Sequence, residues 1–192
     1  MTSADVAIDP WPLLRNGSSV RGRFALRVVV HGRAGGVVPA GLSALMDQVQ
    51  SKRQAPVQLE ALTAERVPDR PDQPVLLIPL LLWPGTHVRE DVPLIRQRLR
   101  DEGSEVTMLP FLGAWPLWWD LVAEALMSQA DPSLVLVHHP LRAGIADCFL
   151  RSLSKRLGLP MVPFDRWGEH HLNHPTDRPL ALALAPNRMT EA

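Results

Sequence analysis

The sequence has almost no cysteine, no tyrosine and no excess of charge of one sign. Its 192 residues include one cysteine, Cys148, and no tyrosine. A single cysteine excludes an intramolecular disulfide framework and a zinc site built from several thiolates, and it is typical of a reducing compartment. The 20 basic and 20 acidic residues cancel, so no net charge attracts nucleic acid or an anionic membrane. A small molecule is therefore the expected partner.

Long hydrophobic runs are also missing. The longest, Val75–Trp83, falls far short of the roughly 20 residues that a membrane-spanning helix needs. The start, MTSADVAIDPWPLL, has acids and prolines where a signal peptide has basic residues and an apolar helix. We therefore expect no secretory or transit segment, no membrane partner and a cytoplasmic location. Residues 1–22 lack periodicity and are predicted to be a poorly ordered leader.

From residue 24 onward, short apolar runs alternate with segments of helical periodicity, and 46% of the chain is hydrophobic. Strands are expected in 24–32, 57–65, 75–83, 105–113, 133–140, 159–164 and 179–186, the last as a strand or a partly paired edge. Helices are expected in 39–54, 89–103, 116–129 and 143–158, with no room for one in the turn-rich 66–74. This order predicts an α/β fold with a parallel sheet and helices on its faces.

Histidine recurs where the predicted strands end. In an open parallel sheet, ligands bind outside the carboxyl ends of the strands. His31 ends the first strand, His87 follows the third, and His138 and His139 end the fifth. Imidazole binds divalent first-row metals and accepts protons near neutral pH. A histidine at a strand end can equally bond a neighbouring carbonyl, so a metal site and a structural role both stay open.

Two acids follow His87 and have two readings of their own. Glu90 and Asp91 stand in the first turn of a predicted helix, where carboxylates offset the helix dipole and satisfy exposed N–H groups. Beside a metal site they would instead accept protons or hold an imidazole in its ligating tautomer. Motifs for other chemistries are missing from the sequence: it has no phosphate-binding G-x-x-x-x-G-K-[ST], no dinucleotide G-x-G-x-x-G and no G-x-S-x-G nucleophile.

With these residues in view, the chain resembles the CbiX-type sirohydrochlorin chelatases, class II chelatases that insert cobalt or ferrous iron into sirohydrochlorin. The motifs that carry the resemblance are VVVHGR, VLLIPLLLWPGTHVREDVP and MLPFLGAWPLWWDLV. They look like the family's strand-H-G-S opening, its apolar strand followed by G-x-H and D-[IV]-P, and its strand, L-G, Pro and helix segment. Together they cover residues 24 to about 130.

The resemblance implies a chelatase-like, flavodoxin-like fold, with a chelatase-like domain in 23–130 and a partial second lobe in 131–192. It implies His31 and His87 as metal ligands, with these histidines and Glu90 as the catalytic groups. Arg33, Gly85 and Arg89 are the substrate-binding residues expected, and Arg142 is a further candidate for a macrocycle carboxylate. The implied reaction belongs to cobalamin or siroheme biosynthesis. Co²⁺ or Fe²⁺ is its substrate, no organic cofactor is needed, and the protein could be a homodimer.

The chain departs from the family pattern in places. Arg33 replaces the usual serine, the helix between the second and third strands is absent, and the second lobe is short, with Pro140 in place of a glycine. These departures keep open a trimmed or degenerate relative, namely a tetrapyrrole- or metal-binding carrier or regulator without insertion activity. A scaffold that pairs with a separate chelatase through its unfinished lobe is a third reading, because an incomplete sheet edge seeks a partner.

A second group of histidines lies near the C-terminus. RWGEHHLNH contains His170, His171 and His174, and the i, i+4 pair His170 and His174 could share one helix face. The neighbouring Gly, Asn and Pro favour a loop instead. This segment is therefore expected to be a surface loop, with a weak accessory metal site as the alternative.

Overall fold

The computed structural model describes residues 23–65, 67, 69, 71–127, 131–141 and 144–184, so the expected leader lies outside the described residues. The strands are β1 (Ala25–Val30), β2 (Val57–Ala61), β3 (Val75–Pro79), β4 (Val106–Met108), β5 (Leu134–His138), β6 (Met161–Pro163) and β7 (Arg178–Ala181). The helices are α3 (Ala40–Gln50), α4 (Val92–Asp101), α5 (Pro116–Met127), α6 (Ile145–Leu157) and α7 (Trp167–Asn173). Short turns are η1 (Ala34–Gly36), η2 (His87–Asp91), η3 (Leu112–Ala114) and η4 (Phe164–Arg166). Each expected strand and helix is confirmed with shorter bounds, and β7 begins one residue before its expected range.

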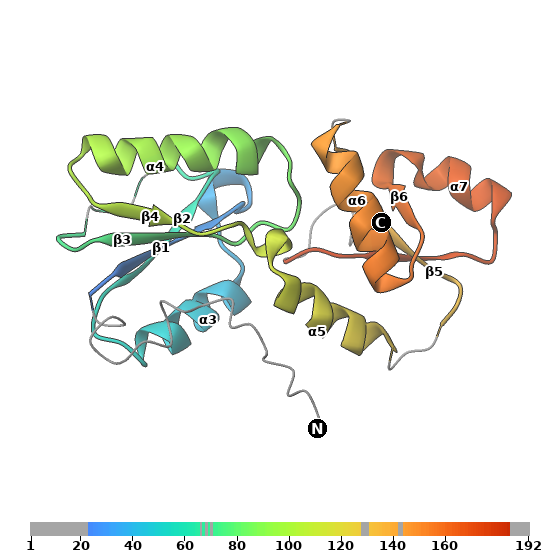
Figure 1. The fold of residues 1–192 in the computed structure, drawn as a ribbon, viewed down its shortest axis with the longest axis horizontal. Helices are drawn as coiled ribbons and strands as arrows, with labels where there is room; N and C mark the ends of the chain where they lie inside the picture. The colour runs from blue at the N-terminus through green and yellow to red at the C-terminus, as the bar shows by residue number, and fades with distance from the viewer. Residues whose placement is uncertain are drawn as a thin grey trace, which may run out of the picture.

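Over the described residues, the strands form two sheets in which every pair is parallel. The four-stranded sheet has the order β2-β1-β3-β4, and the three-stranded sheet has the order β6-β5-β7. Val28 in the middle of β1 pairs with Leu59 of β2 and Ile78 of β3. Figure 1 shows the two sheets side by side with helices around them. The predicted α/β class with parallel sheets is confirmed.

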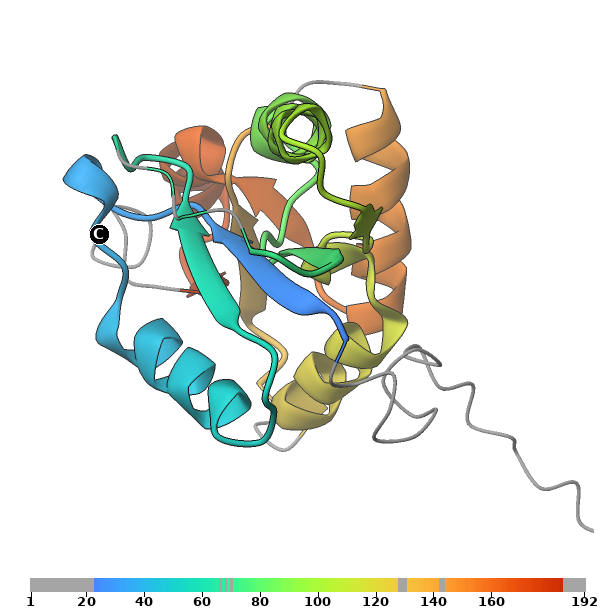
Figure 2. The ribbon, with the colours of Figure 1, turned by 90° about the vertical axis from the view of Figure 1, so that its left-hand side faces the viewer.

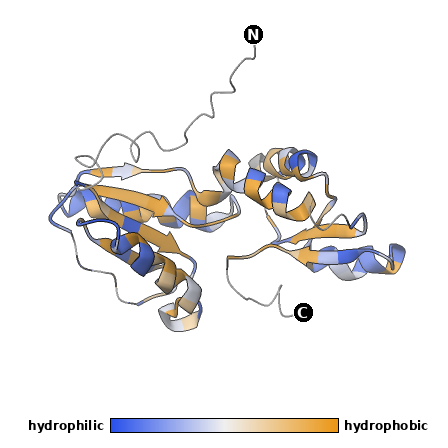
Figure 3. Ribbon diagram, turned by 90° about the horizontal axis from the view of Figure 1, so that it is seen from below, coloured by the Kyte–Doolittle hydropathy of each residue, from blue (hydrophilic) through white to orange (hydrophobic). Residues whose placement is uncertain are grey.

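Helices α3 and α4 cover opposite faces of the four-stranded sheet (Figures 1 and 2). Successive side chains of a strand point to opposite faces, so Val28 packs toward α3 while its neighbour Val29 packs toward α4. From α4, the side chains of Val92, Ile95 and Leu99 enter the core, as their spacing predicts. Full burial of such a side chain stabilises the fold by about 1.5–3 kcal/mol. Figure 3 shows the resulting apolar strands in both sheets.

A buried charge network occupies the part of the sheet beside the connection from β2 to β3. Residues 62–74 contain no helix among those described, as the sequence predicted. Arg27 of β1 is 1% exposed and bonds Glu60 at 3.5 Å and the backbone oxygen of Asp69 at 3.0 Å. Glu60 also accepts two bonds of 2.9 Å from Arg98 of α4. Paired charges therefore fill this region, and burial lowers the pKa of Arg27 despite its partners.

The three-stranded sheet is built around β5, whose five residues are all buried. Helix α5 follows the four-stranded sheet in the chain but packs against α6. Arg156 of α6 and Asp120 of α5 form an ion pair of 2.5 Å at this contact. Among the described residues, no helix has the length and apolar character needed to cross a membrane.

The segment that contains the C-terminal histidines is helical, so the expected loop at 166–174 was wrong. Turn η4 leads directly into α7, and the backbone N–H of His174 donates to the carbonyl oxygen of His170 at 2.9 Å. Gly168 lies within α7, and packing does not require a glycine there, because nothing lies within 4 Å of the position where a Cβ would stand. The helix ends before Pro175, as the backbone restriction imposed by proline requires. One glycine and one asparagine have low helix propensity, but this was not enough to prevent the helix from forming.

Candidate functional site

A cavity of about 880 Å³ lies where the carboxyl ends of strands from both sheets come together. The segments that follow β1, β2 and β3 form one wall, and those that follow β5 and β7 form the other. The lining residues are Val30 to Ala34, Pro39, Leu42, Thr63, Leu80 to Trp83, Gly85 to His87, His139 to Leu141, and Leu182 to Leu184. The position agrees with the rule that ligands of parallel sheets bind beyond the carboxyl ends of the strands.

His31 stands at the cavity because the chain turns sharply after β1. Gly32 adopts a φ of +74°, and a Cβ there would lie 2.6 Å from Oγ1 of Thr63. Thr63 in turn donates to the backbone oxygen of Arg33 at 2.6 Å, which ties the turn after β1 to the end of β2. The glycine is therefore needed both for its backbone conformation and for this close approach. The ring Nδ1 of His31 lies 2.7 Å from the carbonyl oxygen of Gly32.

His87 reaches the cavity from the turn η2, which precedes α4. Its ring Nδ1 lies 2.5 Å from a carboxylate oxygen of Asp91, one helical turn further along. Asp91 is the N-terminal flanking residue of α4, but its side chain makes no capping bond. Of the two readings of this acid, the structure favours the one in which it orients an imidazole. A carboxylate on Nδ1 leaves Nε2 as the ring nitrogen available to a metal.

The rings of His31 and His87 lie edge to face, with centroids 4.7 Å apart. Two imidazoles at this distance, on loops from adjacent strands, are suited to hold one divalent first-row metal ion while leaving coordination positions open toward the cavity. The structure thus brings together the two histidines that the sequence singled out.

The position of the loop that carries His87 depends on a close contact with the segment after β4. A Cβ at Gly113 would lie 1.8 Å from the backbone oxygen of Leu82, so only glycine fits there. The N–H of Gly113 donates to the carbonyl of Leu81 at 3.0 Å, and its own carbonyl accepts from Trp119 Nε1 at 2.6 Å. The L-G pair in the sequence therefore supports the cavity wall.

Aromatic rings from the two halves of the molecule pack together, and one of them, Trp83, also lines the cavity. Trp83 follows β3, and its ring lies 5.7 Å from that of His138 on β5 and 6.3 Å from that of Phe149 on α6. His138 is 3% exposed, and burial lowers its pKa below the ordinary value for histidine. Its ring is therefore neutral at neutral pH and serves the packing of this junction. The adjacent His139 instead lines the cavity, opposite the first pair of histidines.

The polar groups of the cavity are basic or neutral. Arg33 and three histidines lie in the lining, and none of the lining residues that the structure describes is a carboxylate. Seven of the lining residues are leucines, and they come from both walls. Such a cavity suits a largely apolar molecule that carries negative groups.

The other residues singled out from the sequence are distributed unevenly. Gly85 lines the cavity, whereas Arg89 and Glu90 are exposed on η2 and lie outside the lining. Arg142 lies outside the described residues. Sequence reasoning missed Thr63, Trp83 and the stretch 182–184 in the lining. The signal for Trp83 was present, because the apolar run of β3 continues for several residues beyond the end of the strand.

The fold was compared with those of known proteins. The crystal structure of the sirohydrochlorin chelatase SirB from Bacillus subtilis subspecies spizizenii, in complex with cobalt, matches with a TM-score of 0.61 and 14% sequence identity. The match covers 88% of this chain and 78% of that one. The structure of CbiX, described as the terminal enzyme for biosynthesis of siroheme in denitrifying bacteria, matches with a TM-score of 0.50 and 20% identity over 87% of this chain and 95% of that one.

Comparisons of the sequence itself find no similar protein: no family model matches the chain, and no curated protein matches it significantly. The likeness is therefore one of fold. At that level the resemblance seen in the motifs is confirmed, because both matching structures are of sirohydrochlorin chelatases and cover most of the chain.

Proposed function

We propose that this protein, whose fold is that of the sirohydrochlorin chelatases, inserts a divalent metal ion into sirohydrochlorin or a related tetrapyrrole. The observation that carries the proposal is the pair His31 and His87, whose rings lie 4.7 Å apart at the wall of a cavity of about 880 Å³. The proposal takes residues 23–130 and 131–192 as the two chelatase-like parts whose sheets meet at this cavity.

In this proposal the substrate metal binds first to the two imidazoles. His87 offers Nε2, because Asp91 occupies its Nδ1. His31 offers the ring nitrogen that does not face the carbonyl of Gly32. Two protein ligands leave the remaining coordination positions to water, and water and imidazole can both be exchanged for pyrrole nitrogens as the macrocycle approaches.

Insertion releases two pyrrole protons for each metal ion that enters, so the overall charge is conserved. Each imidazole that leaves the metal regains a lone pair and can accept one of these protons. We assign proton acceptance to His31 and His87 for this reason, and because Glu90, the acid expected from the family resemblance, lies outside the cavity lining. His139 on the opposite wall is the additional imidazole within the cavity.

The walls of the cavity support binding of a macrocycle with acidic side chains. Leucines from both walls can cover the faces of the ring, and Arg33 can bond a carboxylate at its edge. Cobalt and ferrous iron are the proposed metals, because imidazole ligands bind both and the SirB structure is a cobalt complex. The product would then belong to cobalamin or siroheme biosynthesis.

The test is the anaerobic loss of the sirohydrochlorin absorption spectrum on addition of Co²⁺ or Fe²⁺. Wild-type protein is compared with His31→Ala, with His87→Ala and with a protein-free control. His171→Ala is the matched control, because His171 is an exposed histidine on α7 outside the cavity lining. We expect acceleration by wild type and His171→Ala, and loss of acceleration in both cavity variants with the fold intact.

Two results would count against the proposal in different ways. Full activity in either cavity variant would remove that histidine from the mechanism. No acceleration by wild type, together with a shifted spectrum of the bound macrocycle, would favour the carrier or regulator instead.

A further inference from the structure

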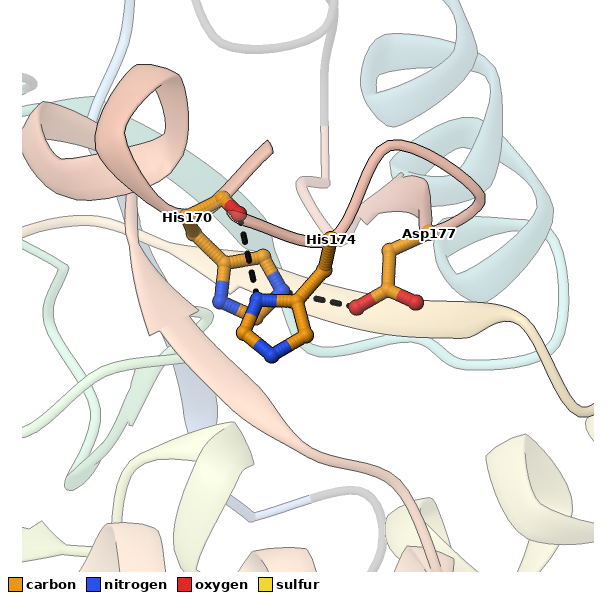
Figure 4. Close-up of side chains that lie close together, drawn as sticks. All are labelled: His170, His174 and Asp177. Carbon is orange, nitrogen blue, oxygen red and sulfur yellow. Dashed lines mark hydrogen bonds and ion pairs between the residues drawn. The ribbon is translucent and has the colours of Figure 1, made fainter. Parts of the chain in front are cut away.

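Helix α7 and the turn after it bring three metal-binding side chains together outside the cavity. His170 lies in the last turn of α7, His174 follows one turn later, and Asp177 stands immediately before β7 (Figure 4). One ring nitrogen from each histidine and one carboxylate oxygen of Asp177 lie within 4.8 Å of one another. The cavity is instead lined by residues that follow β7 in the chain, Leu182 to Leu184.

These positions separate the group from the cavity. The four residues of β7 span about 13 Å, and Asp177 lies at one end of the strand while the lining residue Leu182 lies beyond the other. A metal ion with bonds of about 2.1 Å cannot contact both places. Figure 1 likewise shows α7 on the side of the three-stranded sheet away from the four-stranded sheet.

The hydrogen bonds of the two rings determine which nitrogens are available. Nδ1 of His174 lies 3.2 Å from the carbonyl oxygen of His170. A carbonyl can only accept, so Nδ1 of His174 carries the proton and its Nε2 keeps a free lone pair. Nε2 of His170 lies 2.8 Å from a carboxylate oxygen of Asp177, and a metal ion can replace the proton shared by these two atoms.

Small side-chain rotations are sufficient to close the group around an ion. The ligand atoms of a tetrahedral site with bonds of about 2.1 Å lie about 3.4 Å apart. The rings of His170 and His174 are stacked with centroids 4.5 Å apart, and His174 is exposed and lies just beyond the helix, where it can rotate. His170 is more constrained, because it stacks on Trp167 and contacts Asp177.

We propose that His170, His174 and Asp177 bind a divalent first-row transition metal ion such as Zn²⁺, Co²⁺ or Ni²⁺. Two imidazoles and one carboxylate are a ligand set suited to these ions, and water completes the coordination. The site does not depend on the proposed insertion activity. It binds a metal in the absence of any macrocycle, at a place that the cavity does not include.

A purely structural role is the competing explanation for the same side chains. The contact between His170 and Asp177 would then serve only to hold α7 against the start of β7. His171 offers a matched control, because it lies on the same helix, is exposed and stacks on the same Trp167, but is not part of the group.

The experiment is calorimetric titration of the full chain with ZnCl₂ in a His31→Ala, His87→Ala background, which removes the cavity histidines. We expect one bound Zn²⁺ per chain. Loss of a residue that only hydrogen-bonds a ligand lowers metal affinity about 10- to 100-fold. His174→Ala and Asp177→Ala each remove a direct ligand, so each should weaken binding by at least this factor. His171→Ala should bind as tightly as the background protein.

Either of two outcomes overturns the site: no Zn²⁺ bound by the background protein, or equal weakening in His171→Ala and His174→Ala. Because His174 is exposed, its alanine variant is expected to fold, and circular dichroism confirms this before titration. The insertion assay is also run on His174→Ala in otherwise wild-type protein. Zinc binding and insertion activity can each be lost without the other, so the two assays test the two proposals separately.

Discussion

The two histidine pairs of this protein are positioned in opposite ways. His31 and His87 are 56 positions apart in the numbering and meet because β1 and β3 are adjacent in one sheet. His170 and His174 are one helical turn apart and meet wherever that turn forms. In each pair a carboxylate contacts one ring, Asp91 on His87 and Asp177 on His170. The first pair therefore depends on tertiary packing, and the second mainly on local structure.

This difference predicts which changes break one pair and leave the other intact. Gly113 and Asp91 support the cavity pair, and His170 belongs to the pair on α7. His138 packs where the two halves of the molecule meet.

Gly113→Val should have the largest effect, because its side chain would overlap the backbone of Leu82 and displace the cavity wall. We expect a loss of about 3 kcal/mol or more in the free energy of unfolding, and loss of insertion activity. Gly168→Ala on α7 is the matched control, since it meets no atom within 4 Å and should leave the protein at least as stable. Thermal melts and the spectral assay measure both. An unchanged melting temperature for Gly113→Val would contradict the packing described here.

Asp91→Asn should weaken the cavity pair without unfolding it. The amide still contacts His87 but no longer places a negative charge beside the ring that would bind the metal. Affinity for Co²⁺ in the cavity should fall about 10- to 100-fold, measured by titration in a His174→Ala background. Glu90→Gln on the same turn is the comparison, and its effect should be smaller. An equal effect of the two substitutions would mean that only the net charge of this turn matters.

Acidification should weaken the junction between the two halves of the molecule through His138, whose ring packs on Trp83. Its folded-state pKa lies below that of the unfolded chain, which is about 6.5. As the pH falls below that value, the unfolded state binds a proton before the folded state does, so stability is lost. Between the two pKa values the loss approaches about 1.4 kcal/mol per pH unit.

The measurement for His138 is the urea midpoint at pH 7.5 and pH 5.5, for wild type and for His138→Leu. Part of the pH dependence should disappear in the variant. His139→Leu, which changes an exposed neighbour, should retain it. The same pH dependence in wild type and His138→Leu would show that this ring does not cause it.

His170→Ala should have the smallest effect on stability. It removes one hydrogen bond to Asp177 between partly buried partners and should cost about 1 kcal/mol of unfolding free energy. His171→Ala should change stability by less than about 0.5 kcal/mol, because it is an exposed position. Chemical denaturation of both variants tests this. A larger effect would mean that α7 depends on its tertiary contacts more than the local geometry indicates.

Much of the fold could be predicted because its signals are local. Apolar runs such as Val75 to Pro79 identified the strands, and the spacing of Val92, Ile95 and Leu99 identified the buried face of α4. The helix α7 was missed because the low helix propensities of glycine and asparagine are only weak average tendencies, and the contacts of a particular segment can override them. In the candidate site, the order of strands and helices places His31, His87, His138 and His139 at carboxyl ends of parallel strands. The family resemblance then selected His31 and His87 among them.

The sequence by itself therefore determined the α/β class, the strands and the presence of histidines at their ends, and the family resemblance selected His31 and His87 among these. The tertiary structure alone decided that Glu90 lies outside the cavity lining and that residues 182–184 form part of the opposite wall. It also brought Asp177 to the histidines of α7. The physical reason is that periodicity encodes which side of an element is buried. Which residues come into contact across two packed sheets depends on the tertiary packing of the whole chain.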